Sequence, residues 1–376
     1  MRHPYLMTPG PSPLAPQIRE ALGRDIIHHR TEEFRNILAE INEGLKYVFR
    51  TNEPVLTFAS SGTGAMQAAV SNFLSSKDKA LVVVGGKFGE RWREICETFS
   101  VEVVSLDIEW GSPPSLEKIS DILKKDSQVR AIYTTLCETS TATVYNIKEI
   151  AQLTKDKEIL LVVDAISGLG QDVLETQAWG VDIVVAGSQK GFMLPPGLAF
   201  ISLNKKAEEF LKQSDLPDYY FNVREALKSY QKNDTPFTPA VSLIRGLAEA
   251  IKIIKEEGIE NRWEYFKKLS SATREALKSL GLKLFSKSPS SSVTAVSVEG
   301  LDTQEIVKRM RTKYGISIAG GQAHLKGKII RIAHMGYINE QDMVMCLFCL
   351  EKVLNELGYK LEKGISLKTF QEVFYS

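Results

Sequence analysis

From about residue 54 to residue 203, short apolar runs alternate with amphipathic segments, and this alternation restricts the fold more than any other feature. Most of the runs are rich in Val and Ile and nearly continuously apolar, which is typical of strands buried on both faces. Repeated strand–helix units predict an α/β fold with a mostly parallel sheet and right-handed crossovers. The predicted strands span 55–59, 80–84, 101–106, 129–135, 159–163, 182–186 and 198–203, with helices at 65–74, 89–99, 116–125 and 147–155.

After residue 205 the pattern changes to long amphipathic helices, including 247–257 and 263–280. A polar stretch, SKSPSSS at 286–292, precedes predicted strands at 293–298 and 328–333 and a last helix near 342–357. This pattern indicates a smaller α+β unit. We therefore expect an N-terminal arm at 1–16, a large domain at 17–258 and a small C-terminal domain at 259–376.

Composition excludes several classes of protein. In 376 residues, 47 Lys and Arg nearly balance 46 Asp and Glu, so the chain offers no basic field for nucleic acid or for a membrane surface. The proline-rich N-terminus does not have the apolar run of a signal peptide. Four cysteines are too few for a disulfide scaffold, and Cys346 and Cys349 lie in an apolar run typical of core packing. A cytoplasmic location is expected.

The residues that follow the predicted strands are the first candidates for a site, because sites in parallel sheets lie at the carboxyl ends of strands. SSGTGAM at 60–66 follows the first strand and opens a helix, and its small residues leave backbone N–H groups accessible to an anion. Nucleotide motifs fail here, since Ala65 and Met66 follow Gly64 and Gln67 stands where a dinucleotide motif needs glycine. A phosphate-bearing small molecule and a Ser-capped structural turn are both compatible with this stretch.

Asp164 and Lys190 follow two consecutive strands, in VDAISGLG and GSQKG. Asp164 could simply cap the next segment, and Lys190 could be a surface charge. A parallel sheet, however, would bring both to one edge, where a partly desolvated amine favours its neutral form and can condense with an aldehyde. An aspartate can also pair with the ring nitrogen of pyridoxal phosphate (PLP). Together with the phosphate site, these residues indicate one ligand with three points of attachment.

Eight motifs in order carry a family resemblance: TPGPS (8–12), HHRTEEF (28–34), SSGTGAMQAA (60–69), CETSTA (137–142), VDAISGLG (163–170), GSQKG with PPG (187–197), TPFTP (235–239) and RIAHMG (331–336). From about residue 7 to 350 the chain resembles class V aminotransferases. It is most similar to the alanine–glyoxylate and serine–pyruvate group, which includes proteins described as a soluble hydrogenase small subunit. The resemblance implies a fold-type I PLP enzyme.

The resemblance also implies roles for individual residues. Lys190 would form the Schiff base with PLP and carry the proton during transamination, and Asp164 would pair with the pyridine nitrogen. Phe88 would stack on the ring where relatives often have Trp, and Thr139 would lie beside it. Arg331 matches the arginine that binds the substrate carboxylate, a task that suits its bidentate fork. The cofactor phosphate would be held by Ser61, Gly62, Thr63 and Gln189.

In this family a threonine of the neighbouring subunit reaches the phosphate, so the resemblance implies a homodimer with active sites at the subunit interface. Thr235 is the expected residue, with Thr238 as the rival. Relatives often have a tyrosine three residues earlier, where this chain has Lys232. Arg30 matches a clamp that some relatives use for anionic substrate groups, although an interface ion pair is an equally simple role.

Four histidines have structural explanations that we favour over catalytic or metal-binding ones. His28 and His29 have no Cys or carboxylate partners at metal-ligand spacing, so we expect a loop near the dimer interface. His324 and His334 flank a predicted strand near Arg331, where packing or substrate lining is expected.

The resulting hypothesis is an aminotransferase that moves an amino group from alanine or serine to glyoxylate or pyruvate by ping-pong kinetics. A cysteine desulfurase or selenocysteine lyase on the same fold is the first alternative, but such enzymes typically have His where this chain has Gln189 and Phe88. A non-catalytic partner subunit is the second alternative. Intact Lys190, Asp164 and Arg331 argue against it.

Overall fold

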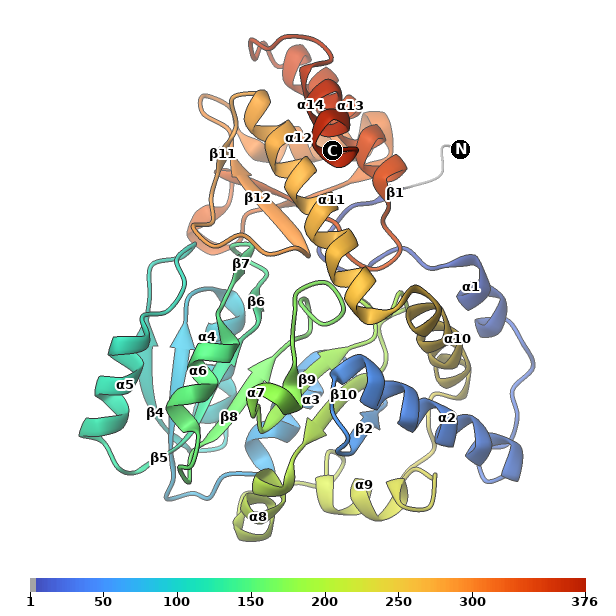
Figure 1. Cartoon of the computed structure of the whole chain (residues 1–376), viewed down its shortest axis with the longest axis vertical. Helices are drawn as coiled ribbons and strands as arrows, with labels where there is room; N and C mark the ends of the chain where they lie inside the picture. The colour runs from blue at the N-terminus through green and yellow to red at the C-terminus, as the bar shows by residue number, and fades with distance from the viewer. Residues whose placement is uncertain (1–4) are drawn as a thin grey trace.

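The computed structural model describes residues 5–376, and its largest element is a seven-stranded sheet (Figure 1). All neighbouring strands in it are parallel except β10, which runs antiparallel to both of its neighbours. The predicted α/β class with a mostly parallel sheet is confirmed. The strand order is β2 (Val55–Phe58), β10 (Ala199–Leu203), β9 (Ile183–Gly187), β8 (Leu160–Asp164), β5 (Val129–Thr135), β3 (Lys79–Val84) and β4 (Glu102–Asp107).

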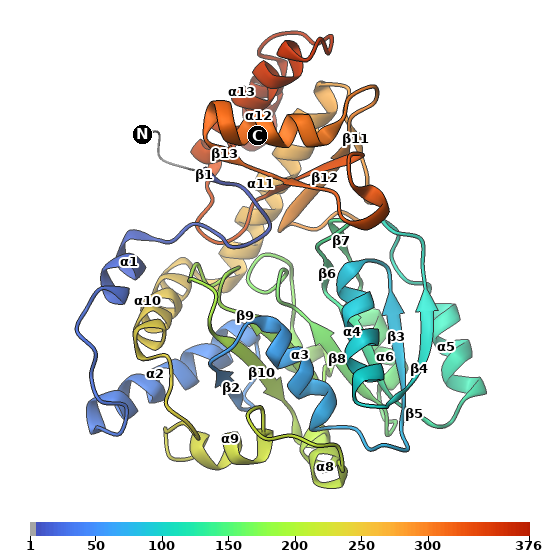
Figure 2. The ribbon, with the colours of Figure 1, turned by 180° about the vertical axis from the view of Figure 1, so that it is seen from behind.

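Helices cover both faces of this large sheet. Side chains alternate across each strand, so Leu81 and Val83 of β3 face one core while Ala80 and Val82 face the other. The first face is covered by α1 (Pro16–Leu22), α2 (Glu32–Phe49), α5 (Leu116–Lys125), α6 (Ile147–Thr154) and α10 (Val241–Glu257). The opposite face, seen from behind in Figure 2, is covered by α3 (Gly62–Ser71), α4 (Lys87–Thr98), α8 (Lys205–Gln213) and α9 (Val223–Tyr230).

A four-stranded antiparallel sheet follows α11 (Ile259–Ser279), the long helix that rises from beside α10 and runs alongside this sheet in Figure 1. Its order is β11 (Lys283–Leu284), β12 (Val293–Ser297), β15 (Ile329–Ala333) and β14 (Ala319–Gly320). It packs with α12 (Thr303–Tyr314), α13 (Glu340–Glu356) and α14 (Ile365–Phe374). The strand β1 (Tyr5–Leu6) pairs with β13 (Ile316–Ser317), which brings this N-terminal segment to the small-sheet part of the chain.

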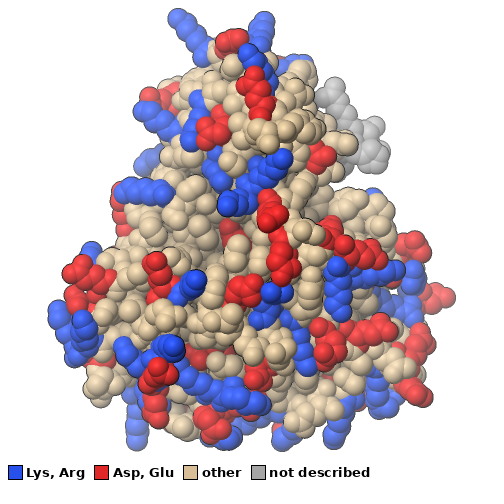
Figure 3. Space-filling model, viewed as in Figure 1, with Lys and Arg blue, Asp and Glu red and all other residues tan. Residues whose placement is uncertain are grey.

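Two sequence predictions about helices were wrong. The helix predicted at 65–74 spans Gly62–Ser71 instead. Its first turn was missed because it contains two glycines, which have low helix propensity. The helix near 342–357 is not the last one, since α14 follows and buries Phe370 and Phe374 in the small-sheet core. Charges of both signs are mixed over the face in Figure 3, and within residues 5–376 no helix is long and apolar enough to cross a membrane.

Candidate active site

Asp164 and Lys190 lie at the same edge of the large sheet. Asp164 is the last residue of β8 and pairs in register with Val185 of the neighbouring strand β9, while Lys190 follows the end of β9 by three residues. Both side chains are buried. Burial lowers the pKa of Lys190 to about 8, although the charge of nearby Asp164 acts in the opposite direction. The edge therefore holds an amine that is easier to deprotonate than a surface lysine.

The Asp164 carboxylate does not have a hydrogen-bonded cation among residues 5–376. One oxygen, Oδ1, accepts a hydrogen bond from the Ile166 N–H at 2.8 Å. Burial raises the Asp164 pKa to about 7; that hydrogen bond lowers it and the nearby Glu138 charge raises it further. A ligand that brought a protonated nitrogen to this carboxylate would favour its ionised form.

The N-terminus of α3 and the Gln189 side chain form a polar cup beside Lys190. Ser61 occupies the N-cap position of α3, yet its hydroxyl does not cap the helix. A Cβ placed on Gly187 would lie 3.1 Å from the Gln189 Oε1 and 3.5 Å from the Gly62 backbone N. The Gln189 Oε1 is buried and lacks a hydrogen-bond partner within the described chain. Unused hydroxyl and backbone donors at the start of a ten-residue helix favour an anion.

Phe88 and Arg91 extend the cup from α4. Phe88 is the second residue of that helix, and the Arg91 guanidinium lies 4.9 Å from the centre of its ring. Arg91 Nη1 also donates to the Thr63 hydroxyl at 3.3 Å. The cation on α4 is thus connected both to the aromatic ring and to the first turn of α3.

Arg331 reaches from the small sheet to the large one. Its Nη1 donates to the Thr139 carbonyl at 2.9 Å and its Nε donates to the Gly320 carbonyl at 3.0 Å. Burial lowers the Arg331 pKa to about 10, with the Glu138 charge opposing this shift. The Thr139 hydroxyl in turn donates to the Ser167 hydroxyl at 2.6 Å. These bonds leave Nη2 of Arg331 without a hydrogen-bond partner in residues 5–376.

The N-terminal segment lies directly against Lys190. The Lys190 Nζ donates to the Pro9 carbonyl, and the Ser12 hydroxyl donates to the Lys190 carbonyl at 2.8 Å. The Ser12 N–H donates to the Gln189 carbonyl at 3.0 Å. Gly10 has φ +99°, and a Cβ on it would lie 2.4 Å from the Lys190 Cε. The positive φ favours glycine at this position, and any larger residue would also displace the end of the Lys190 side chain.

Thr235 and Arg30 form a separate cluster within the chain. The Thr235 hydroxyl donates to the Phe237 carbonyl at 2.8 Å, and Arg30 donates to the Thr235 carbonyl at 2.9 Å. Arg30 also forms an ion pair with Asp234. In the described part of the chain, the hydrogen bonds of Thr235 reach none of the residues around Lys190. Thr238 lines an open groove together with His28 and His29.

The remaining candidates contribute to packing. His334 is buried, its Nε2 lies 3.0 Å from the Thr294 hydroxyl, and burial lowers its pKa to about 3. The His324 ring lies 4.5 Å from the Trp110 ring. Cys346 and Cys349 are buried in α13, and burial raises the Cys346 thiol pKa.

Three residues near the site were not among the sequence candidates: Arg91, Glu138 and Ser167. Arg91 lies three residues after Phe88, so helical spacing alone would have placed both on one face. Glu138 precedes Thr139 in CETSTA. A carboxylate among small polar residues next to a predicted buried strand could have identified it as a candidate buried acid. Ser167 follows Asp164 by three residues, but the sequence carries no sign that it meets Thr139.

Comparison with known proteins matches the class V aminotransferase family over residues 18–345. The chain belongs to the class V aminotransferases. It is 39% identical to the soluble hydrogenase 42 kDa subunit of Anabaena cylindrica, with 98% of each chain covered. It is 34% identical to a serine–glyoxylate aminotransferase of Hyphomicrobium methylovorum, covering 99% of this chain and 94% of the relative. An L-aspartate–glyoxylate aminotransferase of Paracoccus denitrificans is 33% identical, with 98% and 95% covered.

The solved structure of ureidoglycine–glyoxylate aminotransferase from Bacillus subtilis superimposes with a TM-score of 0.95 at 26% identity, covering 100% of this chain and 99% of that one. The resemblance drawn from the eight motifs is confirmed, and so is the fold-type I architecture. Proteins of this family depend on PLP, and this aminotransferase is therefore a PLP enzyme.

The unsatisfied groups of the site fit PLP. The start of α3 at Ser61, Gly62 and Thr63 suits a phosphate. The Gln189 side-chain amide lies at its edge, and only its N–H₂ group can donate to that phosphate. Asp164 has one oxygen without a hydrogen bond in the described residues, where a ring N–H would be accepted. Lys190 supplies an amine with a lowered pKa for the aldehyde.

Proposed function

We propose that this aminotransferase transfers the amino group of a small amino acid, alanine or serine, to glyoxylate or pyruvate. The observation that carries the proposal is Arg331, a buried guanidinium that is fixed on two sides and has one unused fork nitrogen near Lys190. A single fixed guanidinium suits a substrate with one carboxylate. Relatives named as serine–glyoxylate and L-aspartate–glyoxylate aminotransferases support glyoxylate as the acceptor.

Lys190 is the proposed catalytic base and acid. PLP, when bound, supplies an aldehyde that condenses with amines and a ring that accepts electrons from the substrate carbon. With PLP and substrate bound, the Lys190 amine would remove the proton from the substrate Cα and deliver it to the cofactor C4′. Because burial lowers its pKa to about 8, the amine can act in both directions near neutral pH. Two half-reactions of this kind give ping-pong kinetics.

The other proposed site residues hold the cofactor and orient it. Asp164 would accept a hydrogen bond from the ring nitrogen of bound PLP and so keep that nitrogen protonated. Phe88 would stack its ring on that of bound PLP. Thr139, whose carbonyl accepts from Arg331, would lie beside the PLP ring. Phosphate binding is assigned to Ser61, Gly62, Thr63 and Gln189.

The substrate side group is proposed to be small and uncharged. Arg30, the alternative anion clamp, is paired with Asp234 and with the Thr235 carbonyl. Gly10 and Pro9 pack against the Lys190 side chain and limit the space beside the amine. Both observations favour alanine or serine over aspartate as donor.

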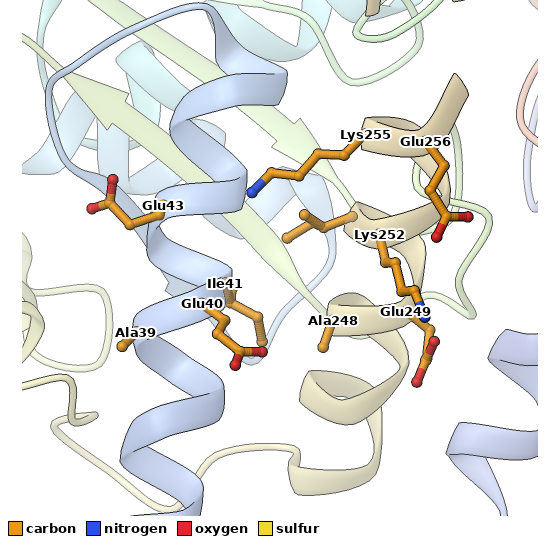
Figure 4. Close-up of a pocket in the computed structure, with 10 residues that line it drawn as sticks. Ala39, Glu40, Ile41, Glu43, Ala248, Glu249, Lys252, Lys255 and Glu256 are labelled. Atoms are coloured by element: carbon orange, nitrogen blue, oxygen red, sulfur yellow. The ribbon is translucent and has the colours of Figure 1, made fainter. Parts of the chain in front are cut away.

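We further propose a homodimer in which Thr235 of one subunit reaches the phosphate of the other. Phe237 and Tyr220 beside Thr235 are exposed and stacked at 5.3 Å, an apolar surface typical of an interface. A groove of 790 Å³ between α2 and α10 has an apolar floor and charged rims (Figure 4). In Figure 4, Ile41 and Ala248 face this groove and Lys255 extends toward α2. It contains no proposed catalytic residue, and an interface role suits it better.

The domain limits and the compartment are also proposals. Gly258, with φ +80°, both ends α10 and begins α11, and this supports a boundary between 17–258 and 259–376 after an arm at 1–16. The small number of cysteines supports a reducing, cytoplasmic location.

A half-reaction screen tests the function. Purified protein is mixed with single amino acids, and loss of the visible absorbance of bound PLP is followed. Alanine or serine should remove it rapidly, glyoxylate or pyruvate should restore it, and Lys190→Ala should abolish both responses. A strong response to aspartate with none to alanine would refute the substrate assignment. Sulfide release from cysteine would favour a desulfurase, and failure to bind PLP would favour a non-catalytic subunit.

A further inference from the structure

Glu138 is a fully buried carboxylate that the proposed mechanism does not use. It lies in the short hairpin formed by β6 (Cys137–Glu138) and β7 (Thr143–Val144). Its pKa is raised by burial, and hydrogen bonds from Ser140, Gly89 and Phe88 oppose that shift. A buried acid surrounded by donors needs an explanation, because its desolvation is costly.

The two oxygens of Glu138 together accept hydrogen bonds from two different segments. Oε2 accepts from the backbone N–H groups of Phe88 at 3.1 Å and Gly89 at 3.0 Å, in the first turn of the twelve-residue α4. Oε1 accepts from the Ser140 N–H at 3.2 Å and from the Ser140 hydroxyl. The Ser140 hydroxyl accepts from the Lys87 N–H at 3.0 Å, which closes the connection.

Each connected segment presents one group to the site. The hydrogen bond from the Phe88 N–H to Glu138 fixes the start of α4, and therefore the backbone position from which the Phe88 side chain extends. Holding Ser140 fixes the turn whose Thr139 carbonyl accepts from Arg331 Nη1 at 2.9 Å. The charge of Glu138 is also close enough to act on both Arg331 and Asp164.

We propose that Glu138 is a positioning residue, whose carboxylate sets the Phe88 ring and the Thr139–Arg331 contact in register with each other. The proposal rests on the functions proposed above for Phe88 and Arg331. A structural acid would stabilise the hairpin alone, whereas a positioning acid controls both the orientation of the cofactor and the affinity for the substrate carboxylate.

Glu138→Gln is the sharpest variant, because it keeps the shape and removes the charge. Both oxygens accept from N–H or O–H donors, so the new amide N–H₂ must face a donor in either orientation. The matched control is Glu90→Gln, in the first turn of the same helix, where Glu90 is partly exposed and paired with Lys87. Ser140→Ala is the second variant. It removes the hydroxyl that donates to Glu138 and accepts from the Lys87 N–H, without burying a new polar group.

Four quantities are measured: the PLP dissociation constant of the apoprotein, the circular dichroism of the bound cofactor band, KM and kcat for the amino donor, and the thermal midpoint. Free PLP is achiral, so its induced dichroism reports how firmly the protein orients the ring. For Glu138→Gln we expect weaker dichroism and rises of about tenfold in both the PLP dissociation constant and KM. Ser140→Ala should shift the same quantities less, and Glu90→Gln should match the wild type.

A Glu138→Gln protein with a lower thermal midpoint but unchanged dichroism, PLP affinity and KM would overturn the proposal. If that variant does not fold, a folded Ser140→Ala protein with wild-type values would overturn it equally. Failure of the wild type to bind PLP would instead refute the proposed function, so the two failures are distinguishable.

Discussion

The lowered pKa of Lys190 predicts how fast the apoprotein captures PLP at different pH values. Only the neutral amine attacks an aldehyde, so the capture rate follows the deprotonated fraction. Burial lowers the pKa from its usual 10.5 to about 8. By this value about one lysine in ten is neutral at pH 7 and about nine in ten at pH 9. At pH 7 the neutral fraction is roughly 300 times that of an unshifted lysine.

The expected pH profile therefore rises about tenfold between pH 7 and pH 9 and levels off above it. The assay mixes apoprotein with PLP and follows the visible absorbance over time. Asp164→Asn is the informative companion, because the Asp164 charge raises the Lys190 pKa. Removing that charge should shift the midpoint of the profile to lower pH.

A rate that increases about a hundredfold over the same interval, without levelling, would refute this prediction, since that is the behaviour of an amine with its usual pKa. A midpoint that moves upward in Asp164→Asn would refute the assigned direction of the Asp164–Lys190 interaction.

Three further predictions concern the substrate, the dimer and the joint between the sheets. Arg331→Lys keeps the charge but loses the fork, so KM for the amino donor should rise at least about tenfold, and an unchanged KM would contradict the assigned clamp. Lys190→Ala and Thr235→Val should each be inactive alone. When the two proteins are mixed, about half of the dimers should contain one subunit of each kind, and one of the two sites in such a dimer is complete, so about a quarter of wild-type activity should return. Thr238→Val in place of Thr235→Val tests whether Thr238 is the residue that reaches the phosphate. Arg262, on α11, donates to the carbonyls of Gly191 in the large domain and Gly336 in the small one. Arg262→Met leaves these two buried carbonyls unpaired, so urea unfolding should show a loss of about 2 kcal/mol in the free energy of unfolding. An unchanged midpoint would show that water replaces the guanidinium.

The positions of Asp164 and Lys190 were predictable because they depend on local patterns. Apolar Val/Ile runs define strands, consecutive parallel strands end at one edge, and residues just after those ends must meet there. The same reasoning predicted a phosphate site, or a Ser-capped turn, at the start of α3 from its small residues. No knowledge of distant contacts was required for this half of the site.

The other half depends on contacts that a linear pattern does not encode. Arg331 lies on β15 in a different sheet, and its bond to the Thr139 carbonyl requires the two sheets to be correctly docked. The segment around Gly10 contacts Lys190, and it is held beside the small sheet by the pairing of β1 with β13, about 300 residues away in the sequence. For Arg331 the family resemblance supplied what periodicity could not, while Glu138 was missed because its partners are backbone N–H groups.

The charges around Lys190 explain why this edge should accept anionic ligands. Two buried carboxylates, Asp164 and Glu138, face two guanidiniums, Arg331 and Arg91, and the amine of Lys190. With Lys190 neutral, the two negative and two positive charges cancel. The Glu138 carboxylate accepts from four donors, whereas the Asp164 carboxylate has one oxygen that can still accept from a cation. The unused donors then belong to Arg331 and the start of α3. A ligand with a cationic ring nitrogen, a phosphate and a carboxylate-bearing substrate places each charge against its complement, which neither a dicationic nor an uncharged ligand would do.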